Sequence, residues 1–189
     1  MNYRILFTLL CFIATLQTGY SQKIYQFKKG SVSFFSEAPL ENIEAQNSKV
    51  NALLNMKTGE VFFKIEIRGF KFKKALMEEH FNENYMESEQ YPFATFKGKI
   101  LQFSEARLNE KDTTNFSAKG IINLHGVEKE YTVDVSLQQK KEELFTAQST
   151  FQIRLEEHSI SIPKLVFQNI AEVVDVQLQG TFIPFDGKL

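Results

Sequence analysis

Apolar and polar residues alternate along most of the chain after residue 21. Val61, Phe63, Ile65 and Ile67 are apolar at every second position, with Lys64 and Glu66 between them. A period of two predicts β-strands with one dry and one wet face, which is typical of antiparallel sheets. The same alternation recurs over residues 116–124, 131–138, 145–153 and 174–182.

Short turn segments separate these strands. Lys57–Glu60, His125–Glu128 and Lys140–Glu143 each join one alternating segment to the next. Sequential strands joined by short loops form hairpins, and consecutive hairpins form an up-and-down meander. Closure of such a sheet removes its unpaired edges. The sequence therefore predicts a mainly β, antiparallel up-and-down barrel of about eight strands, a size that holds either packed side chains or one small ligand.

One segment has helical spacing instead. Between Lys73 and Met86 the apolar residues fall at Leu76, Met77, Phe81 and Tyr85, with His80 beside them. This spacing predicts one helix packed on the barrel. Pro92 then begins a new strand, whereas residues 156–168 favour neither a helix nor a loop.

The N-terminus reads as a secretory signal peptide over residues 1–21, followed by one domain over residues 22–189. Arg4 provides the positive charge, Ile5–Leu16 the apolar stretch, and Gly19–Ser21 the small residues of a cleavage site. The apolar stretch is about a dozen residues, short of the ~20 that a membrane-spanning helix needs, which disfavours an uncleaved anchor and a stable membrane span. Cys11 lies inside the apolar stretch, so a lipoprotein anchor is rejected. The expected location is the periplasm or the extracellular space.

Composition narrows the function classes. Cys11 is the single cysteine and would leave with the signal peptide, so we expect no disulfide, thiol nucleophile or thiolate metal site. A net charge of −1 argues against nucleic-acid binding. The chain has 19 Phe and no Trp. Ordinary core packing explains any single Phe, but the set also suits a wall around an apolar ligand.

Three motifs resemble the YceI-like family. The first is the helix with the strand after it, Leu76–Gly98, which contains Tyr91-Pro92-Phe93-Ala94-Thr95-Phe96. The second is the glycine-led strand and hairpin Gly120–Lys129, with Gly126-Val127-Glu128-Lys129. The third, a weaker match, is Phe151-Gln152-Ile153-Arg154 with the closing strand 173–182. Together the three motifs span most of the chain in the family's order.

The resemblance implies a lipocalin-like barrel, export, and an isoprenoid-type lipid held in the barrel. An isoprenoid quinone or a polyprenyl phosphate is the kind of ligand implied. The chain departs from the family near its start. Many members have an Asp and a His-Ser pair before their first strand, whereas Tyr25–Ser36 contains no His. The head group of the ligand is therefore left open.

The expected ligand site is the barrel interior. Small residues such as Gly98, Ala118 and Gly120 beside large Phe side chains would leave a tunnel, and each buried CH₂ of a lipid contributes roughly 0.8 kcal/mol. The residues expected to line the cavity are apolar or aromatic and lie on the inward strand faces and the helix: Phe63, Ile65, Ile67, Phe72, Met77, Phe81, Tyr85, Phe96, Phe116, Ile122, Val133, Val135, Phe151, Val176 and Phe182.

No motif for catalysis or for a metal is present. His80, His125 and His158 are the three histidines, and no two have the i, i+4 spacing of a helical zinc site. Glu79, His80 and Glu83 could share a helix edge, but a solvated face explains them better. We expect no enzymatic activity, no catalytic residues and no cofactor other than the lipid.

Two alternatives remain open at this stage. One is an exported protein-interaction module whose barrel is fully packed and whose loops bind a partner. The other is an enzyme acting on a lipid, which would need titratable groups inside the barrel. The sequence also leaves a homodimer open.

Overall fold

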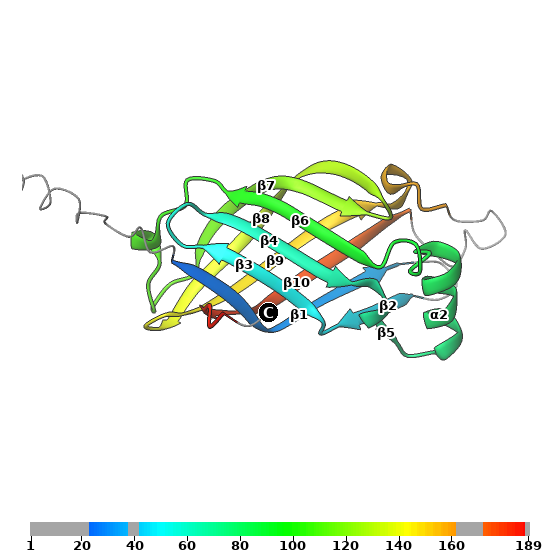
Figure 1. Ribbon diagram of the computed structural model, residues 1–189, viewed down its shortest axis with the longest axis horizontal. Coiled ribbons are helices and arrows are strands. Elements are labelled where there is room, and N and C mark those ends of the chain that lie inside the picture. The colour runs from blue at the N-terminus through cyan, green and yellow to red at the C-terminus, as the bar shows by residue number, and fades with distance from the viewer. Residues whose placement is uncertain (1–22, 38–41, 162–171, 188–189) are drawn as a thin grey trace, which may run out of the picture.

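The computed structural model describes residues 23–37, 42–161 and 172–187 (Figure 1). The predicted signal peptide lies outside these ranges, as do residues 162–168 of the segment 156–168 for which the sequence favoured neither helix nor loop. The strands are β1 (Ile24–Ser36), β2 (Ile43–Asn47), β3 (Val50–Asn55), β4 (Glu60–Glu66), β5 (Lys71–Phe72), β6 (Phe93–Ile100), β7 (Thr114–Leu124), β8 (Val127–Lys141), β9 (Leu144–Arg154) and β10 (Val173–Pro184). The helical segments are η1 (Ile67–Gly69), α2 (Ala75–His80), η2 (Phe81–Tyr85), η3 (Glu105–Arg107) and η4 (Leu155–His158).

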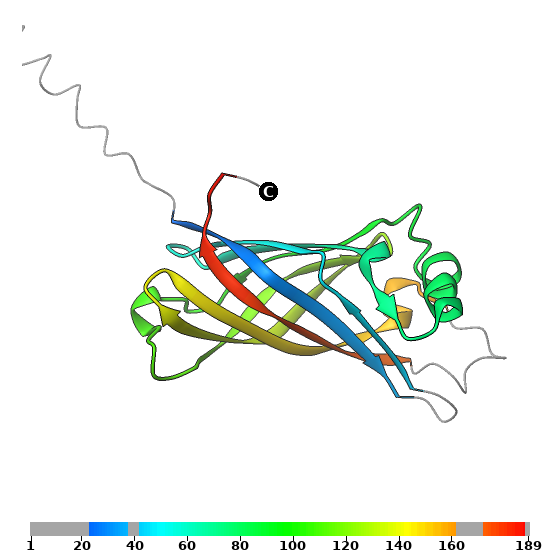
Figure 2. The same cartoon turned by 90° about the horizontal axis from the view of Figure 1, so that it is seen from below.

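Eight of these strands close into an antiparallel barrel, which confirms the predicted fold class. Their order is β1-β3-β4-β6-β7-β8-β9-β10, and β10 pairs back onto β1. Figure 2 shows β1 and β10 side by side along the face where the barrel closes. The hairpins at Lys57–Glu60, His125–Glu128 and Lys140–Glu143 join β3 to β4, β7 to β8 and β8 to β9, as the turn signals predicted.

Strand β1 changes neighbour partway along its length. Its first residues, Ile24–Gln26, pair with β3, and Val32–Ser36 pair with β2. A register shift between Lys28 and Ser31 on the β10 side marks a bulge, where Lys29 has a φ of 52°. Bulges bend a strand, and this bend lets β2 and β5 extend the wall at one end of the barrel.

The two ends of the barrel differ. The segment α2–η2 lies at one end, together with η1 and η4, whereas η3 and the β8–β9 hairpin lie at the other (Figures 1 and 2). We call these the helix end and the closed end. At the closed end, Tyr25, Leu54, Met56 and Phe145 are each no more than 2% exposed, so this end is filled by side chains.

The helix departs from the regular pattern expected over 73–86. It begins as an α-helix at Ala75 and becomes a π-helix over Phe81–Tyr85, with the Met86 amide donating to the Phe81 carbonyl at 2.9 Å. Met77, Phe81 and Tyr85 face the barrel, but Leu76 is 60% exposed. Leu76 therefore shares the helical spacing of these residues but does not face the barrel with them.

Two glycines on adjacent strands make room for an aromatic ring, and do not leave open space as expected. Gly98 on β6 pairs with Gly120 on β7. A Cβ at Gly98 would lie 2.6 Å from Cζ of Phe96, and one at Gly120 would lie 2.8 Å from its Cε2. The Phe96 ring thus covers both glycines inside the barrel.

Candidate functional site

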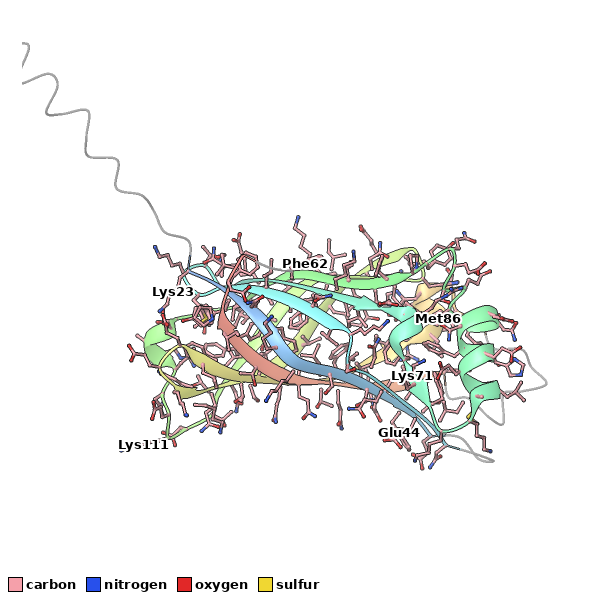
Figure 3. All side chains as sticks on the ribbon, turned by 60° about the horizontal axis from the view of Figure 1, so that its bottom comes forward. Lys23, Glu44, Phe62, Lys71, Met86 and Lys111 are labelled. Carbon is pink, nitrogen blue, oxygen red and sulfur yellow. The ribbon has the colours of Figure 1, made fainter. Side chains whose placement is uncertain are left out.

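A cavity of about 480 Å³ occupies the helix-end part of the barrel. Its walls come from every barrel strand except β3, with α2–η2 across the end. His80 both lines the cavity and is exposed, which places an opening beside the helix. In Figure 3, Lys71 and Met86 mark this end, and Lys23 and Lys111 mark the other. The volume lies within the ~300–1,000 Å³ of typical ligand sites.

An aromatic cluster forms one side of the cavity at the helix end. The ring of Phe81 stacks on Phe34 at 5.6 Å between centroids and meets Phe70 edge-on at 5.5 Å. Phe72 adds a further ring 5.0 Å from Phe81. Aromatic pairs of this kind contribute roughly 0.5–1.5 kcal/mol beyond their buried area. The cluster therefore fixes the helix across the end of the barrel.

The walls are almost entirely apolar. The polar side chains among the described lining residues are few: Ser36, His80, Tyr85, Thr95, Gln148 and Ser149. Burial raises the pKa of the Tyr85 hydroxyl, so it is a neutral hydrogen-bonding group near physiological pH. The Ser149 hydroxyl donates to the Asp134 carbonyl at 2.6 Å. None of the described lining residues is Asp, Glu, Lys or Arg, so the wall suits an uncharged chain.

The structure places all but one of the predicted lining residues on this cavity. Those that line it are Phe63, Ile65, Ile67, Phe72, Met77, Phe81, Tyr85, Phe96, Ile122, Val133, Val135, Phe151, Val176 and Phe182. The exception is Phe116, which packs at the closed end against Phe103 and beneath the Arg107 guanidinium. Whether the lining residues contact a ligand stays a prediction.

Several lining residues were missed by the sequence reasoning. Phe34 alternates with Val32 and Ser36, so its period-two pattern could have identified it. Phe70 follows η1 and has no such signal. Leu155 and Ile160 also line the cavity, but Leu155 directly precedes, and Ile160 lies within, the segment 156–168 that favoured neither helix nor loop.

The segment η4 seals a gap in the wall. Pairing of β8 with β9 runs from Lys141–Leu144 to Asp134–Thr150, and beyond it η4 packs against β8. His158 is fully buried there: its Nδ1 lies 3.2 Å from the Val127 carbonyl and its Nε2 lies 3.0 Å from the Tyr131 hydroxyl. With Nδ1 donating and Nε2 accepting, the neutral ring satisfies both bonds.

A second histidine ties η4 to the loop after the helix. His125 lies in the β7–β8 turn with a φ of 52°. Its Nδ1 is 3.2 Å from the His158 carbonyl, its Nε2 is 2.9 Å from a Glu87 carboxylate oxygen, and the Tyr91 ring packs on it at 4.5 Å. Neither His125 nor His158 lines the cavity. These contacts join the β7–β8 turn, η4 and the loop after the helix at the helix end.

The state of His158 predicts a loss of stability in acid. Burial lowers the pKa of His158, an effect that the hydrogen bond to the Val127 carbonyl partly opposes. In the unfolded chain the His158 imidazole has a pKa of ~6.5, so it binds a proton more readily there than in the folded protein. The free energy of unfolding should therefore be intact above pH ~6.5 and fall below it, by up to about 1.4 kcal/mol per pH unit.

Urea unfolding at several pH values measures this effect. The variant His158→Gln should lose stability overall but show a shallower dependence on pH than the wild-type protein, and His80→Gln, at an exposed position, is the control for replacing a histidine with glutamine. Glu157, Lys129 and Tyr131 also face His158 and are unchanged in both variants. Equal slopes in all three proteins would contradict the assignment.

No metal site is formed by the described residues: no three His, Cys, Asp or Glu side chains lie close enough together to hold an ion. The Asn84 side-chain amide, four residues along the helix, donates a hydrogen bond to Nδ1 of His80 at 2.9 Å. No helix in the ranges that the structure describes has the length and apolarity to cross a bilayer.

An eight-stranded antiparallel barrel around an apolar cavity, with a helix across one end, defines a lipocalin-like class of barrel protein. The YceI-like domain family matches residues 24–182. The chain belongs to the YceI-like family, as the three sequence motifs implied.

Solved structures share the fold at low sequence identity. A polyisoprenoid-binding domain from Saccharophagus degradans, implicated in plant cell wall breakdown, superposes with a TM-score of 0.75 at 13% identity, covering 87% of this chain and 100% of that one. BcnA from Burkholderia cenocepacia gives 0.68 at 16% identity, covering 81% and 96%. A YceI protein from Campylobacter jejuni gives 0.63 at 11% identity, covering 92% and 96%. Comparison with functionally curated proteins gives no match.

Proposed function

We propose that this protein binds the apolar chain of an isoprenoid-type or related lipid in its cavity, for transport, storage or sequestration. One observation carries the proposal: a 480 Å³ space with an almost wholly apolar wall inside a small barrel. A chain that fills this space loses its contact with water, and each buried CH₂ contributes roughly 0.8 kcal/mol. The S. degradans structure, a polyisoprenoid-binding domain of the same fold, supports this ligand class.

The cavity also argues against the two alternative functions, a packed interaction module and an enzyme acting on a lipid. A fully packed interaction module would have no free volume at its centre. An enzyme acting on the bound chain would need titratable groups in the wall, and the described lining residues contain only His80 and Tyr85, both at the helix end. The arrangement favours binding without catalysis.

We further propose that the mature protein is exported to the periplasm or beyond the cell. The apolar segment Ile5–Leu16 with Arg4 before it supports export. Mass measurement of the protein recovered from the cell envelope or the medium should show a chain that begins near Gln22. A chain that retains Met1 and stays in the cytoplasm would contradict export.

Native mass spectrometry of the mature protein, produced with export, tests the binding proposal. We expect a stoichiometric adduct that organic extraction releases as a long-chain lipid, which would also identify the head group. A bare mass that does not change after incubation with isoprenoid lipids would refute the proposal and direct the search to protein partners.

A further inference from the structure

The cavity has a floor, formed where the closed end begins. Leu137 and Phe182 are the lining residues nearest the closed-end termini of β8 and β10, and they are only 1% and 2% exposed. Phe182 pairs in register with Phe145, whose ring meets Tyr25 edge-on at 5.4 Å. Neither Tyr25 nor Phe145 lines the cavity. The buried rings of Phe145 and Tyr25 therefore lie on the closed-end side of the cavity.

Aromatic packing makes this floor rigid. Phe182 contacts Phe27 at 4.8 Å and Phe63 at 6.3 Å between ring centroids, and Phe27 meets Phe63 edge-on at 5.5 Å. The Phe27 ring occupies the space that a side chain at Gly180 would need. Close packing on this scale resists displacement by a ligand, so a bound chain ends at the floor.

The volume above the floor limits how many carbons fit. A cavity of about 150 Å³ holds one benzene molecule. The 480 Å³ of this cavity is roughly three times that volume, which corresponds to about eighteen to twenty apolar carbons.

The depth of the cavity gives an independent limit. The lining runs from Ala147 to Ile153 on β9 and from Val174 to Phe182 on β10. At ~3.4 Å per residue and a strand tilt of ~40°, these spans correspond to about 15–20 Å along the barrel axis. An extended chain advances ~1.2 Å per bond, as a polypeptide backbone does, so about thirteen to seventeen bonds fit.

We propose that the cavity selects its ligand by length, burying one chain of about fifteen to twenty carbons. This corresponds to three or four isoprene units or a common straight acyl chain. A longer chain keeps its excess carbons and its head group outside the opening, where they gain nothing from burial. The inference rests on the proposed lipid-binding function and assigns Leu137 and its cross-strand neighbour Ala147 as the residues that set the length.

Native mass spectrometry tests the proposal. Delipidated protein is incubated with an equimolar mixture of straight-chain primary alcohols of about ten to about twenty-four carbons, and the occupancy of each alcohol is measured. Occupancy should rise about fourfold per added methylene and stop rising at about fifteen to twenty carbons. Leu137→Ala should move this limit upward by about two carbons, and Ala147→Leu should move it downward by a similar amount.

The double variant Leu137→Ala/Ala147→Leu is the matched control. It exchanges two side chains that face each other across β8 and β9, keeps their total volume, and should restore the wild-type limit. Circular dichroism confirms that each variant is folded. If Leu137→Ala fails to fold, Ala147→Leu, which fills existing space, tests the floor alone.

The outcomes separate the two proposals. If no alcohol and no three-, four- or eight-unit prenyl alcohol binds the wild-type protein, lipid binding itself is refuted. Length selection is refuted, while lipid binding stands, if alcohols bind but their occupancy keeps rising up to the longest chain. The same conclusion follows if occupancy stops rising at a chain length outside about fifteen to twenty carbons, or if the folded variants do not change that chain length.

Discussion

Replacing Ala94 with Phe should lower the affinity for a bound lipid by about a thousandfold. Ala94 on β6 pairs with Ile65 on β4 and lines the helix-end half of the cavity. A phenyl ring there occupies the space of about six ligand carbons, each contributing roughly 0.8 kcal/mol when buried. The loss of about 5 kcal/mol corresponds to more than three powers of ten in the dissociation constant.

The matched control is Ile121→Phe on the neighbouring strand β7. Ile121 is 45% exposed on the outer face, so a ring there adds no volume to the cavity. Titration with a lipid that binds the wild-type protein should give unchanged affinity for Ile121→Phe. Ala94→Phe should still show a cooperative unfolding transition, because overpacking costs typically about 1–3 kcal/mol. Wild-type affinity in a folded Ala94→Phe protein would place the ligand elsewhere.

The largest expected loss of stability comes from Gly120→Ala. A Cβ at this position would lie 2.5 Å from the Gly98 Cα and 2.5 Å from the Lys97 carbonyl oxygen. Both are backbone atoms of the adjacent strand, so the strands themselves must separate. We expect the free energy of unfolding to fall by about 3 kcal/mol or more, as measured by urea denaturation.

Gly180→Ala offers a contrasting control. The atoms that its Cβ would meet all belong to the Phe27 side chain, which a smaller residue removes. In a double-mutant cycle, Phe27→Leu should recover part of the loss caused by Gly180→Ala, with a coupling of about 0.5–3 kcal/mol. Phe96→Leu should recover little of the loss in Gly120→Ala. Equal recovery in the two cycles would contradict the backbone clash at Gly120.

The sequence predicts the barrel well because its main signal is local. One wet and one dry face along each strand require alternation, and tight hairpins require turn residues such as Gly59 and Gly126, both at a φ of +74°. The inward positions of residues such as Phe63, Ile122 and Val176 follow directly from that alternation.

The remaining features depend on contacts that alternation does not encode. Phe116 has the inward pattern, yet it does not line the cavity, because its ring packs against Phe103 and under Arg107, contacts with a segment outside the strands that alternation does not encode. Gly98 and Gly120 looked like open space because the sequence does not show that the Phe96 ring lies over both. Leu155 and Ile160 reach the cavity only because η4 fills the end of the β8–β9 gap.

The packed closed end has a consequence for how a lipid would move between partners. A cavity that is open at one end only has a single entrance, so a bound ligand leaves by the opening through which it entered. A donor and an acceptor cannot occupy opposite ends and pass a chain through the barrel. If the protein carries a lipid as proposed, donor and acceptor must contact the helix end in turn, and the loaded protein must diffuse between them as a free intermediate.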